Sequence, residues 1–117
     1  MQMRKAVKKE MIELNEITKQ KLMKNWGEKA DSLECMAEVR VYDPSSSWEC
    51  FIYALNPNDE DEIECIIRGS KMEEPFICVW AFSRMASFSN SLMDGVVIDH
   101  EYRPMHAAIL FNKLGGK

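Results

Sequence analysis

The stretch that decides the fold runs from Trp48 to Leu55 and reads WECFIYAL. Side chains of a β-strand alternate between its two faces. One face would carry Trp48, Cys50, Ile52 and Ala54, and the other Phe51, Tyr53 and Leu55. Both faces are apolar from Phe51 onward. We therefore expect this strand to be central in its sheet, or to meet another element or subunit on one face.

Four further stretches have the composition of strands. They alternate between apolar and polar residues or are rich in β-branched and aromatic residues, and turns containing proline, glycine or asparagine separate them. These stretches are residues 36–42, 63–68, 76–82 and 96–98. The short link between residues 55 and 63 favours an antiparallel hairpin between the two strands that it joins.

Helices are predicted before, between and after these strands. Residues 11–26 have apolar side chains at helical spacing, with Thr18 as the expected N-cap. Residues 27–32 are predicted to be a polar connection. A short helix at residues 83–93 precedes the last strand, and Pro104 would begin a carboxy-terminal helix. The predicted fold class is α+β, with a mainly antiparallel sheet of about five strands.

Length and charge limit the classes of protein to consider. The 117 residues suit one domain, so we expect a basic amino-terminal extension or helix at residues 1–13 and a single α+β domain at residues 14–117. The apolar fraction of 46% is enough for a core. The net charge of −4 repels phosphate backbones, which argues against direct nucleic-acid binding.

The cysteines predict free thiols. They lie at positions 35, 50, 65 and 78 without any C-x-x-C pair, and the later three lie within apolar segments, where cysteine behaves as a small hydrophobe. The amino terminus is basic and has no apolar run of signal-peptide length, and no stretch approaches the ~20 apolar residues of a membrane span. We therefore expect a cytoplasmic protein with no membrane association.

Several segments resemble a small bacterial family, the domain of unknown function 2958 family. The resemblance covers about residues 14–104 and lies in an early helix, a strand followed by a proline turn and an aromatic residue, an acidic turn, and a late strand that runs into an acidic pair. These segments are residues 17–22, 39–48, 56–59 and 97–104. The family often has a glycine-rich stretch where residues 68–72 offer one glycine. The resemblance implies a protein carried on plasmids, phages or other mobile elements, and brings no activity and no catalytic residues.

One cluster has the residue types of a chemical site. His100 and His106, with Asp99 and Glu101, could together hold a metal weakly, because imidazole and carboxylate both bind transition metals. The spacing of the two histidines crosses Pro104, so their rings need not converge. The sequence contains no nucleophile signature and no glycine-rich phosphate loop. We expect a non-enzymatic protein without a cofactor.

The leading functional hypothesis is a binding protein of a phage or other mobile element. If the predicted helices cover only one sheet face, the other would be shielded by a host protein or by a second copy in a homodimer. An acidic surface can occupy a basic groove meant for nucleic acid, so an anti-defence inhibitor is the sharpest version. The residues expected to bind the partner are Trp48 and Tyr53 for contact and Asp59, Glu60, Asp61 and Glu62 for charge.

The alternative hypothesis is a small-ligand binding protein. It would sequester a nucleotide or signalling molecule in an aromatic pocket, and the amino-terminal lysines or Arg84 and Arg103 would meet the phosphate.

Overall fold

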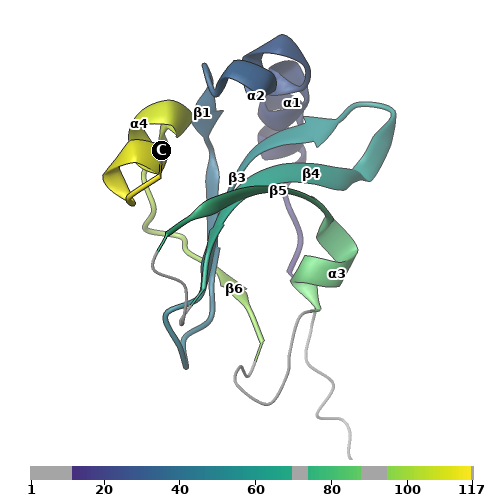
Figure 1. Cartoon of the computed structure of the whole chain (residues 1–117). Coiled ribbons are helices and arrows are strands. Elements are labelled where there is room, and N and C mark those ends of the chain that lie inside the picture. Colours follow the sequence, from purple (N-terminus) through teal and green to yellow (C-terminus); the bar gives the residue numbers. More distant parts are fainter. Residues whose placement is uncertain (1–11, 70–73, 88–94, 117) are drawn as a thin grey trace, which may run out of the picture.

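The fold is a five-stranded antiparallel sheet with helices on both of its faces (Figure 1). The computed structural model describes residues 12–69, 74–87 and 95–116. The sheet has the order β5-β4-β3-β2-β6. Its strands are β2 (Val39–Tyr42), β3 (Glu49–Asn56), β4 (Asp59–Arg68), β5 (Phe76–Ala81) and β6 (Val97–Ile98). The predicted α+β class and the antiparallel pairing are confirmed.

The remaining elements are short. A second, two-stranded sheet joins β1 (Met36–Ala37) to β7 (Met105–His106). The helices are α1 (Glu16–Asn25), α2 (Glu28–Ser32), α3 (Phe82–Ala86) and α4 (Ala107–Lys113). The described residues include no helix with the length and hydropathy of a membrane span.

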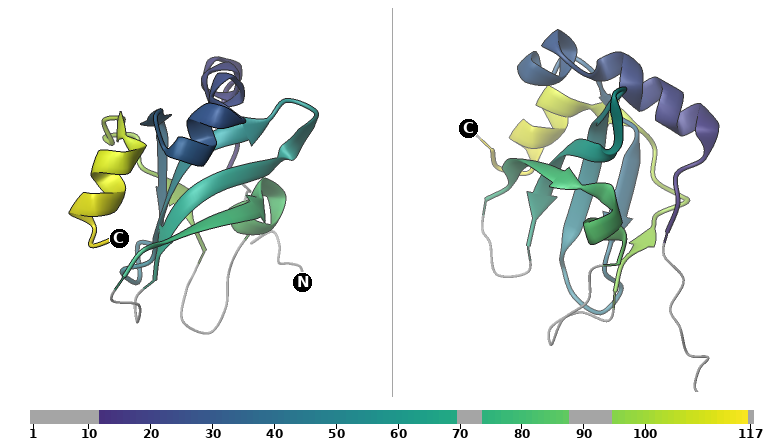
Figure 2. Two further views of the ribbon diagram at one scale, coloured as in Figure 1. Left: turned by 45° about the horizontal axis from the view of Figure 1, so that its top comes forward. Right: turned by 90° about the vertical axis from the view of Figure 1, so that its right-hand side faces the viewer.

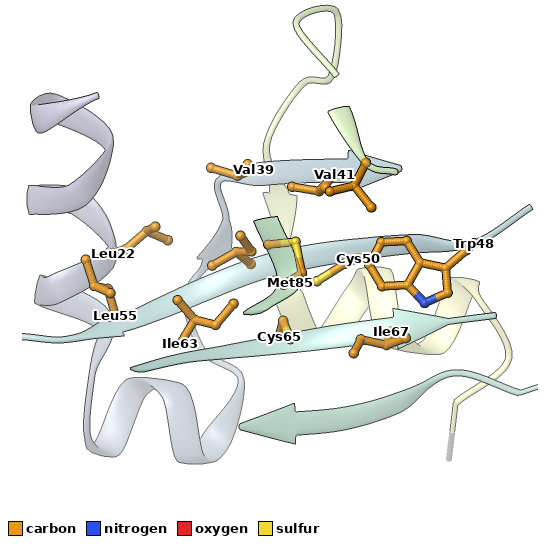
Figure 3. Packing of buried hydrophobic residues seen from close by; sticks show 12 residues of the cluster. Leu22, Val39, Val41, Trp48, Cys50, Leu55, Ile63, Cys65, Ile67 and Met85 are labelled. Carbon is orange, nitrogen blue, oxygen red and sulfur yellow. The ribbon is translucent and has the colours of Figure 1, made fainter. Parts of the chain in front are cut away.

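The strand that decides the fold is buried on both faces by the chain itself. Two hydrophobic clusters lie on opposite sides of β3. The α1-side cluster contains Leu22 of α1 and Met85 of α3 (Figure 3). The α4-side cluster contains Ala30 of α2 and Leu110 of α4. The central position of β3 is confirmed, and a partner is not needed to cover it.

A β-bulge changes which face each residue of β3 occupies. The pairing register with β4 shifts between Ile52 and Ala54. Past this point Ala54 joins Tyr53 in the α4-side cluster, whereas Leu55 joins Ile52 in the α1-side cluster. The assignment of Ala54 and Leu55 from strict alternation was therefore wrong, because a bulge places one extra residue in the strand.

The hairpin between β3 and β4 is longer than predicted. Asn56 pairs with Asp59, so only Pro57 and Asn58 form the turn. The Asn58 N–H donates to the Asn56 side chain at 2.8 Å. The acidic run from residue 59, expected as a loop, is instead the start of β4 and carries its charges at the tip of the hairpin.

Three helix boundaries differ from the predictions. Asn15 is the N-cap of α1, and its side chain accepts from the Thr18 N–H at 2.8 Å. Residues expected as a polar connection form α2, which follows Gly27 with a φ of 101° that suits glycine. The carboxy-terminal helix begins at Ala107 rather than Pro104, because Met105 and His106 first pair with β1.

Parts of two predictions lie outside the described residues. The helix expected at 83–93 is present as α3 up to Ala86, and residues 88–94 are not described. Of the expected extension at 1–13, residues 1–11 are likewise not described.

The four cysteines are free thiols, as predicted. Cys35, Cys50 and Cys65 are buried, and Cys78 is partly exposed. Burial raises the pKa of the Cys35 thiol to about 11 and also raises that of Cys78. Both thiols are therefore poor nucleophiles at neutral pH.

Candidate functional site

One edge of the main sheet is open and uncharged. In the part of the chain that the structure describes, β5 pairs with β4 and with no other strand (Figure 2, right). Its sequence, FICVWA, has no charged residue and no proline. Edge strands usually carry charges, bulges or proline, because an unprotected edge is a template for another strand. β5 has none of these three protections in its sequence or pairing.

The apolar side chains of this edge are exposed. Phe76, Ile77 and Val79 are 40%, 45% and 56% exposed. The face of β5 toward the α1-side cluster carries Phe76, Cys78 and Trp80, which lie opposite Ile67, Cys65 and Ile63. Ile77 and Val79 lie on the other face. We call Ile77 and Val79 the β5 edge patch.

The pairing register explains why Ile77 and Val79 are uncovered. Ile77 lies opposite Ile66 of β4, which is buried in the α4-side cluster. Gly115, just beyond α4, lies close to Pro75 at the start of β5. The helix therefore covers the centre of the sheet and stops before Ile77 and Val79.

Carboxylates lie beside the patch on the same face. The β4–β5 register places Glu64 opposite Val79 and Glu62 opposite Ala81. At this end of the sheet there is a hollow of about 350 Å³. It is lined by Asp59, Asp61, Glu62, Val79, Trp80, Ala81 and Arg84. The hairpin tip predicted as a charged surface thus adjoins the open edge.

The four predicted carboxylates have different roles. Asp61 accepts from the Ser83 N–H at 2.7 Å and from the Ser83 hydroxyl at 2.8 Å, so it caps the start of α3. Glu60 is exposed and lies 3.5 Å from the Lys19 ammonium. The Asp59 carboxylate accepts from the Asp61 N–H, and Glu62 accepts from the Asn56 amide at 2.9 Å. Asp61 is therefore structural, whereas the Glu62 side chain lines the hollow.

Glu64 is a partly buried carboxyl with no ion-pair partner among the described residues. Its carboxylate accepts from the Tyr53 hydroxyl at 3.1 Å. Burial raises the pKa of Glu64, and the nearby carboxylates of Asp31 and Glu62 raise it further against the lowering effect of the Tyr53 hydrogen bond. Among the described residues, neither Glu62 nor Glu64 forms an ion pair. This face of the sheet is suited to a cation.

The two aromatic residues predicted to contact a partner belong to the core. Trp48 is 8% exposed and packs edge-on against Trp80, with ring centroids 6.4 Å apart. Tyr53 is fully buried. The contact role predicted for both residues was wrong, because α1, α2, α3 and α4 cover both faces of β3. Three of the exposed apolar residues instead lie next to one another in sequence or on one face of β5. Its charge-free sequence was the signal, but the order of the strands was needed to interpret it.

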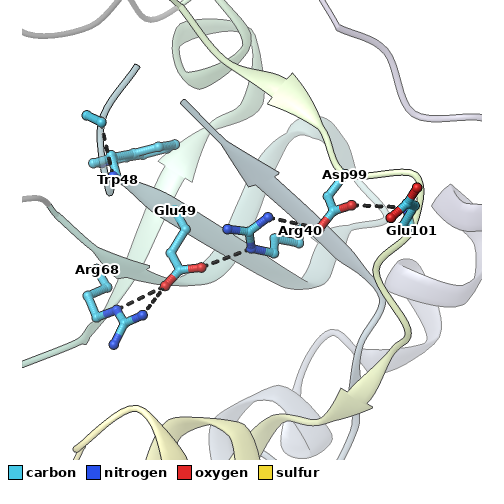
Figure 4. Close-up of polar contacts among 7 residues, drawn as sticks. Arg40, Trp48, Glu49, Arg68, Asp99 and Glu101 are labelled. Atoms are coloured by element: carbon cyan, nitrogen blue, oxygen red, sulfur yellow. Dashed lines mark hydrogen bonds and ion pairs between the residues drawn. The ribbon is translucent and has the colours of Figure 1, made fainter. Parts of the chain in front are cut away.

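A second charged cluster neutralises itself (Figure 4). The Arg40 guanidinium donates to Glu49 at 2.9 Å and to Asp99 at 2.8 Å, and Arg68 donates to the other Glu49 oxygen at 2.9 Å. Two cations thus meet two anions across β2, β3, β4 and the residue after β6. We interpret this network as structural.

The histidines do not form a metal site with their neighbours. His106 lies 3.5 Å from Glu34, and His100 is exposed near the start of α1. Among the described residues, no group of three or more histidine, cysteine, aspartate or glutamate side chains is arranged to hold a metal.

Comparisons with known proteins add no relative. No family model, curated protein or solved structure matches the chain. The resemblance to the domain of unknown function 2958 family therefore stays a prediction from the sequence. The β5 edge and the hairpin tip are the features of the fold that bear on function.

Proposed function

We propose that this chain is a non-enzymatic binding protein that docks on another protein through the open edge of β5. The observation that carries the proposal is an uncharged edge strand whose Ile77 and Val79 are 45% and 56% exposed. An extended segment of a partner can add to such an edge as a further strand. Main-chain hydrogen bonds then supply affinity, and alternate side chains supply specificity.

The surface combines two kinds of interaction. Covering Ile77 and Val79 removes apolar area from water, which favours association. The carboxylates at the neighbouring hairpin tip favour partners with positive charge and speed their encounter. The role predicted for Asp59, Glu60 and Glu62 is kept in this proposal, and the contact role moves from Trp48 and Tyr53 to the β5 edge patch.

The biological setting is proposed from the sequence resemblance. A small acidic protein of a phage or mobile element that docks on a host protein would fit this surface. An anti-defence inhibitor that covers a basic groove is one member of that class.

The small-ligand alternative has less support for nucleotides. The hollow beside β5 has three carboxylates and one arginine, Arg84, in its lining, so its charge repels phosphate. A thermal-shift screen with nucleotides tests this alternative. A specific ligand at one hundred times its dissociation constant would add about 2.7 kcal/mol of stability.

A random peptide display library, selected on the whole chain, tests the docking proposal. We expect enriched peptides with apolar residues at every second position, and at least tenfold weaker binding of these peptides to Val79→Lys. The matched control is Ile109→Lys on α4, since Ile109 is 60% exposed but lies on another element. Equal binding to the Val79→Lys variant and the wild type, with both folded by circular dichroism, would show that β5 is not the docking edge.

A further inference from the structure

On the sheet face that carries Ile77 and Val79, charged side chains of β4 lie beside small and apolar side chains of β5. Along β4 the exposed side of this face carries Glu64 and Glu62, and along β5 the residues opposite them are Val79 and Ala81. Ala81 ends β5 and has only a methyl group as its side chain. Nothing on β5 itself therefore screens Glu62 from the position where a further strand would lie.

A strand added to β5 would lie within reach of these carboxylates. Neighbouring strands are about 4.8 Å apart, so the added strand would be about 10 Å from β4. Lysine and arginine lay their aliphatic stems along apolar surface while the charged head extends beyond it. From a position opposite Ala81, such a side chain can cross the small residue and bring its charge to Glu62.

The electrostatics favour a cation at this place. Glu62 and Glu64 lie on one face, two residues apart, and neither forms an ion pair among the described residues. Asp31 and Glu62 both raise the pKa of Glu64, and burial raises it more. A positive charge would reduce this repulsion, whereas an anionic or apolar side chain would leave it unchanged.

We infer that the segment docking on β5 is an extended strand with apolar side chains over Ile77 and Val79 and a lysine or arginine opposite Ala81, paired with Glu62. This inference rests on the proposed function and names the chemistry of its partner. The apolar positions and the basic position all lie on one face of the added strand, so they occur at every second residue. The residues between them face the other way, and this inference does not restrict their type.

A second copy of the chain fits this surface less well. A two-fold axis perpendicular to the sheet would pair two β5 strands antiparallel, with the same face of each sheet on the same side. Paired residues must then point to the same face, so the axis passes through a residue that pairs with its own copy. In registers centred on Cys78 or Val79, the residue opposite Ala81 is Pro75 or Ile77. Neither carries a positive charge, and each copy has a net charge of −4.

The test is a charge exchange between the chain and a peptide. The probes are two fluorescein-labelled peptides of β5 length with valine at alternate positions. In an antiparallel pairing the first valine-face position of the peptide lies opposite Ala81 at the end of β5. One peptide has lysine in this first position, and the other has glutamate there. For the wild type we expect the lysine peptide to bind about threefold to fivefold more tightly at low salt, as for a partly exposed ion pair. Glu62→Gln should abolish this preference, and Glu62→Lys should reverse it.

The control is Glu60→Gln, which removes the same charge from the hairpin tip at a side chain that is 59% exposed. An unchanged lysine preference in Glu62→Gln, with binding still lost in Val79→Lys, would overturn this inference and leave docking on β5 intact. If neither peptide shows binding that is lost in Val79→Lys, both this inference and the docking of a partner on β5 are overturned. A light-scattering mass of a dimer that becomes a monomer in Val79→Lys would assign the edge to a second copy, and the inference would fail.

Discussion

At the scale of single residues, the carboxylate of Glu49 is held by two arginines. Glu49 is 7% exposed, yet both of its oxygens accept hydrogen bonds, one from Arg40 and the other from Arg68. Arg40 also bonds Asp99 and lies with its guanidinium 4.6 Å from the Tyr42 ring centroid. A buried charge without such partners would be costly, so this network ties together strands that are distant in sequence.

We predict that Arg40→Met lowers the free energy of unfolding by about 1–3 kcal/mol, because it leaves Glu49 and Asp99 with fewer partners in a partly buried place. Urea unfolding followed by tryptophan fluorescence measures the change. The control is Arg103→Met, an exposed arginine for which less than about 0.5 kcal/mol is expected. Equal losses in both variants would contradict a structural role for the network.

A second prediction concerns Glu64 and pH. The raised pKa of this carboxyl means that folding favours its protonated form relative to the unfolded chain. The contribution of Glu64 to stability is therefore fully present below its ordinary pKa, about 4.3 in peptides, and is lost as the pH rises through the folded value. Glu64→Gln keeps an acceptor for the Tyr53 hydroxyl and removes the charge.

The Glu64→Gln variant should therefore gain stability relative to the wild type as the pH rises from about 4 to 7. Urea unfolding at several pH values measures this difference. The conservative control Tyr53→Phe removes the hydroxyl but not the charge. A stability difference between Glu64→Gln and wild type that stays constant across this range would show that burial does not perturb Glu64.

At the scale of elements, local side-chain chemistry sets where α1 begins. Asn15 has an extended backbone and its side chain accepts from the Thr18 N–H, which satisfies one of the unpaired donors of the first turn. For β5, local sequence explains only that the segment is a strand. Its position at the edge of the sheet follows from its pairing with β4.

We predict that Asn15→Ala destabilises the protein by about 1 kcal/mol through loss of this cap. Thr18→Ala, at the position that the sequence pattern had indicated as the cap, should change stability by less than about 0.5 kcal/mol. Chemical denaturation of the two variants side by side compares them. A larger loss for Thr18→Ala would reverse the assignment of the cap.

At the scale of the whole molecule, helices cover the middle of the sheet on both faces and leave one edge open (Figure 2). Acidic residues gather at the end of the hairpin that adjoins this edge. The net charge of −4 adds a general repulsion of anionic partners. The overall field therefore favours the same class of partner as the local geometry.

Association with the lysine peptide should consequently depend on salt. Replacing Asp59, Glu60 and Glu62 by lysine should slow association at least threefold at about 0.01 M ionic strength and much less at about 1 M, where the Debye length is about 3 Å. Stopped-flow fluorescence measures the rates. Asp61 is left unchanged, because its two bonds to Ser83 cap α3. Equal association rates for the wild type and this variant at low salt would show that the acidic hairpin tip does not steer association.

The sequence by itself determined the fold class and most strands of the main sheet. Alternation and turn residues located β3, β4, β5 and β6 to within a few residues and indicated an antiparallel sheet, since these signals are local. It also located the acidic run from Asp59 to Glu62. Local pattern failed at the bulge after Ile52 and at α2, where pairing and packing override it.

Only the tertiary structure decided which apolar residues are covered. Tyr53 and Val79 have similar local settings in apolar strands, yet Tyr53 is fully buried and Val79 is 56% exposed. The difference arises because β3 is the central strand with a helical layer on each face, whereas β5 is an edge strand. Burial depends on neighbours contributed by distant parts of the chain, and a residue's own sequence context does not contain them.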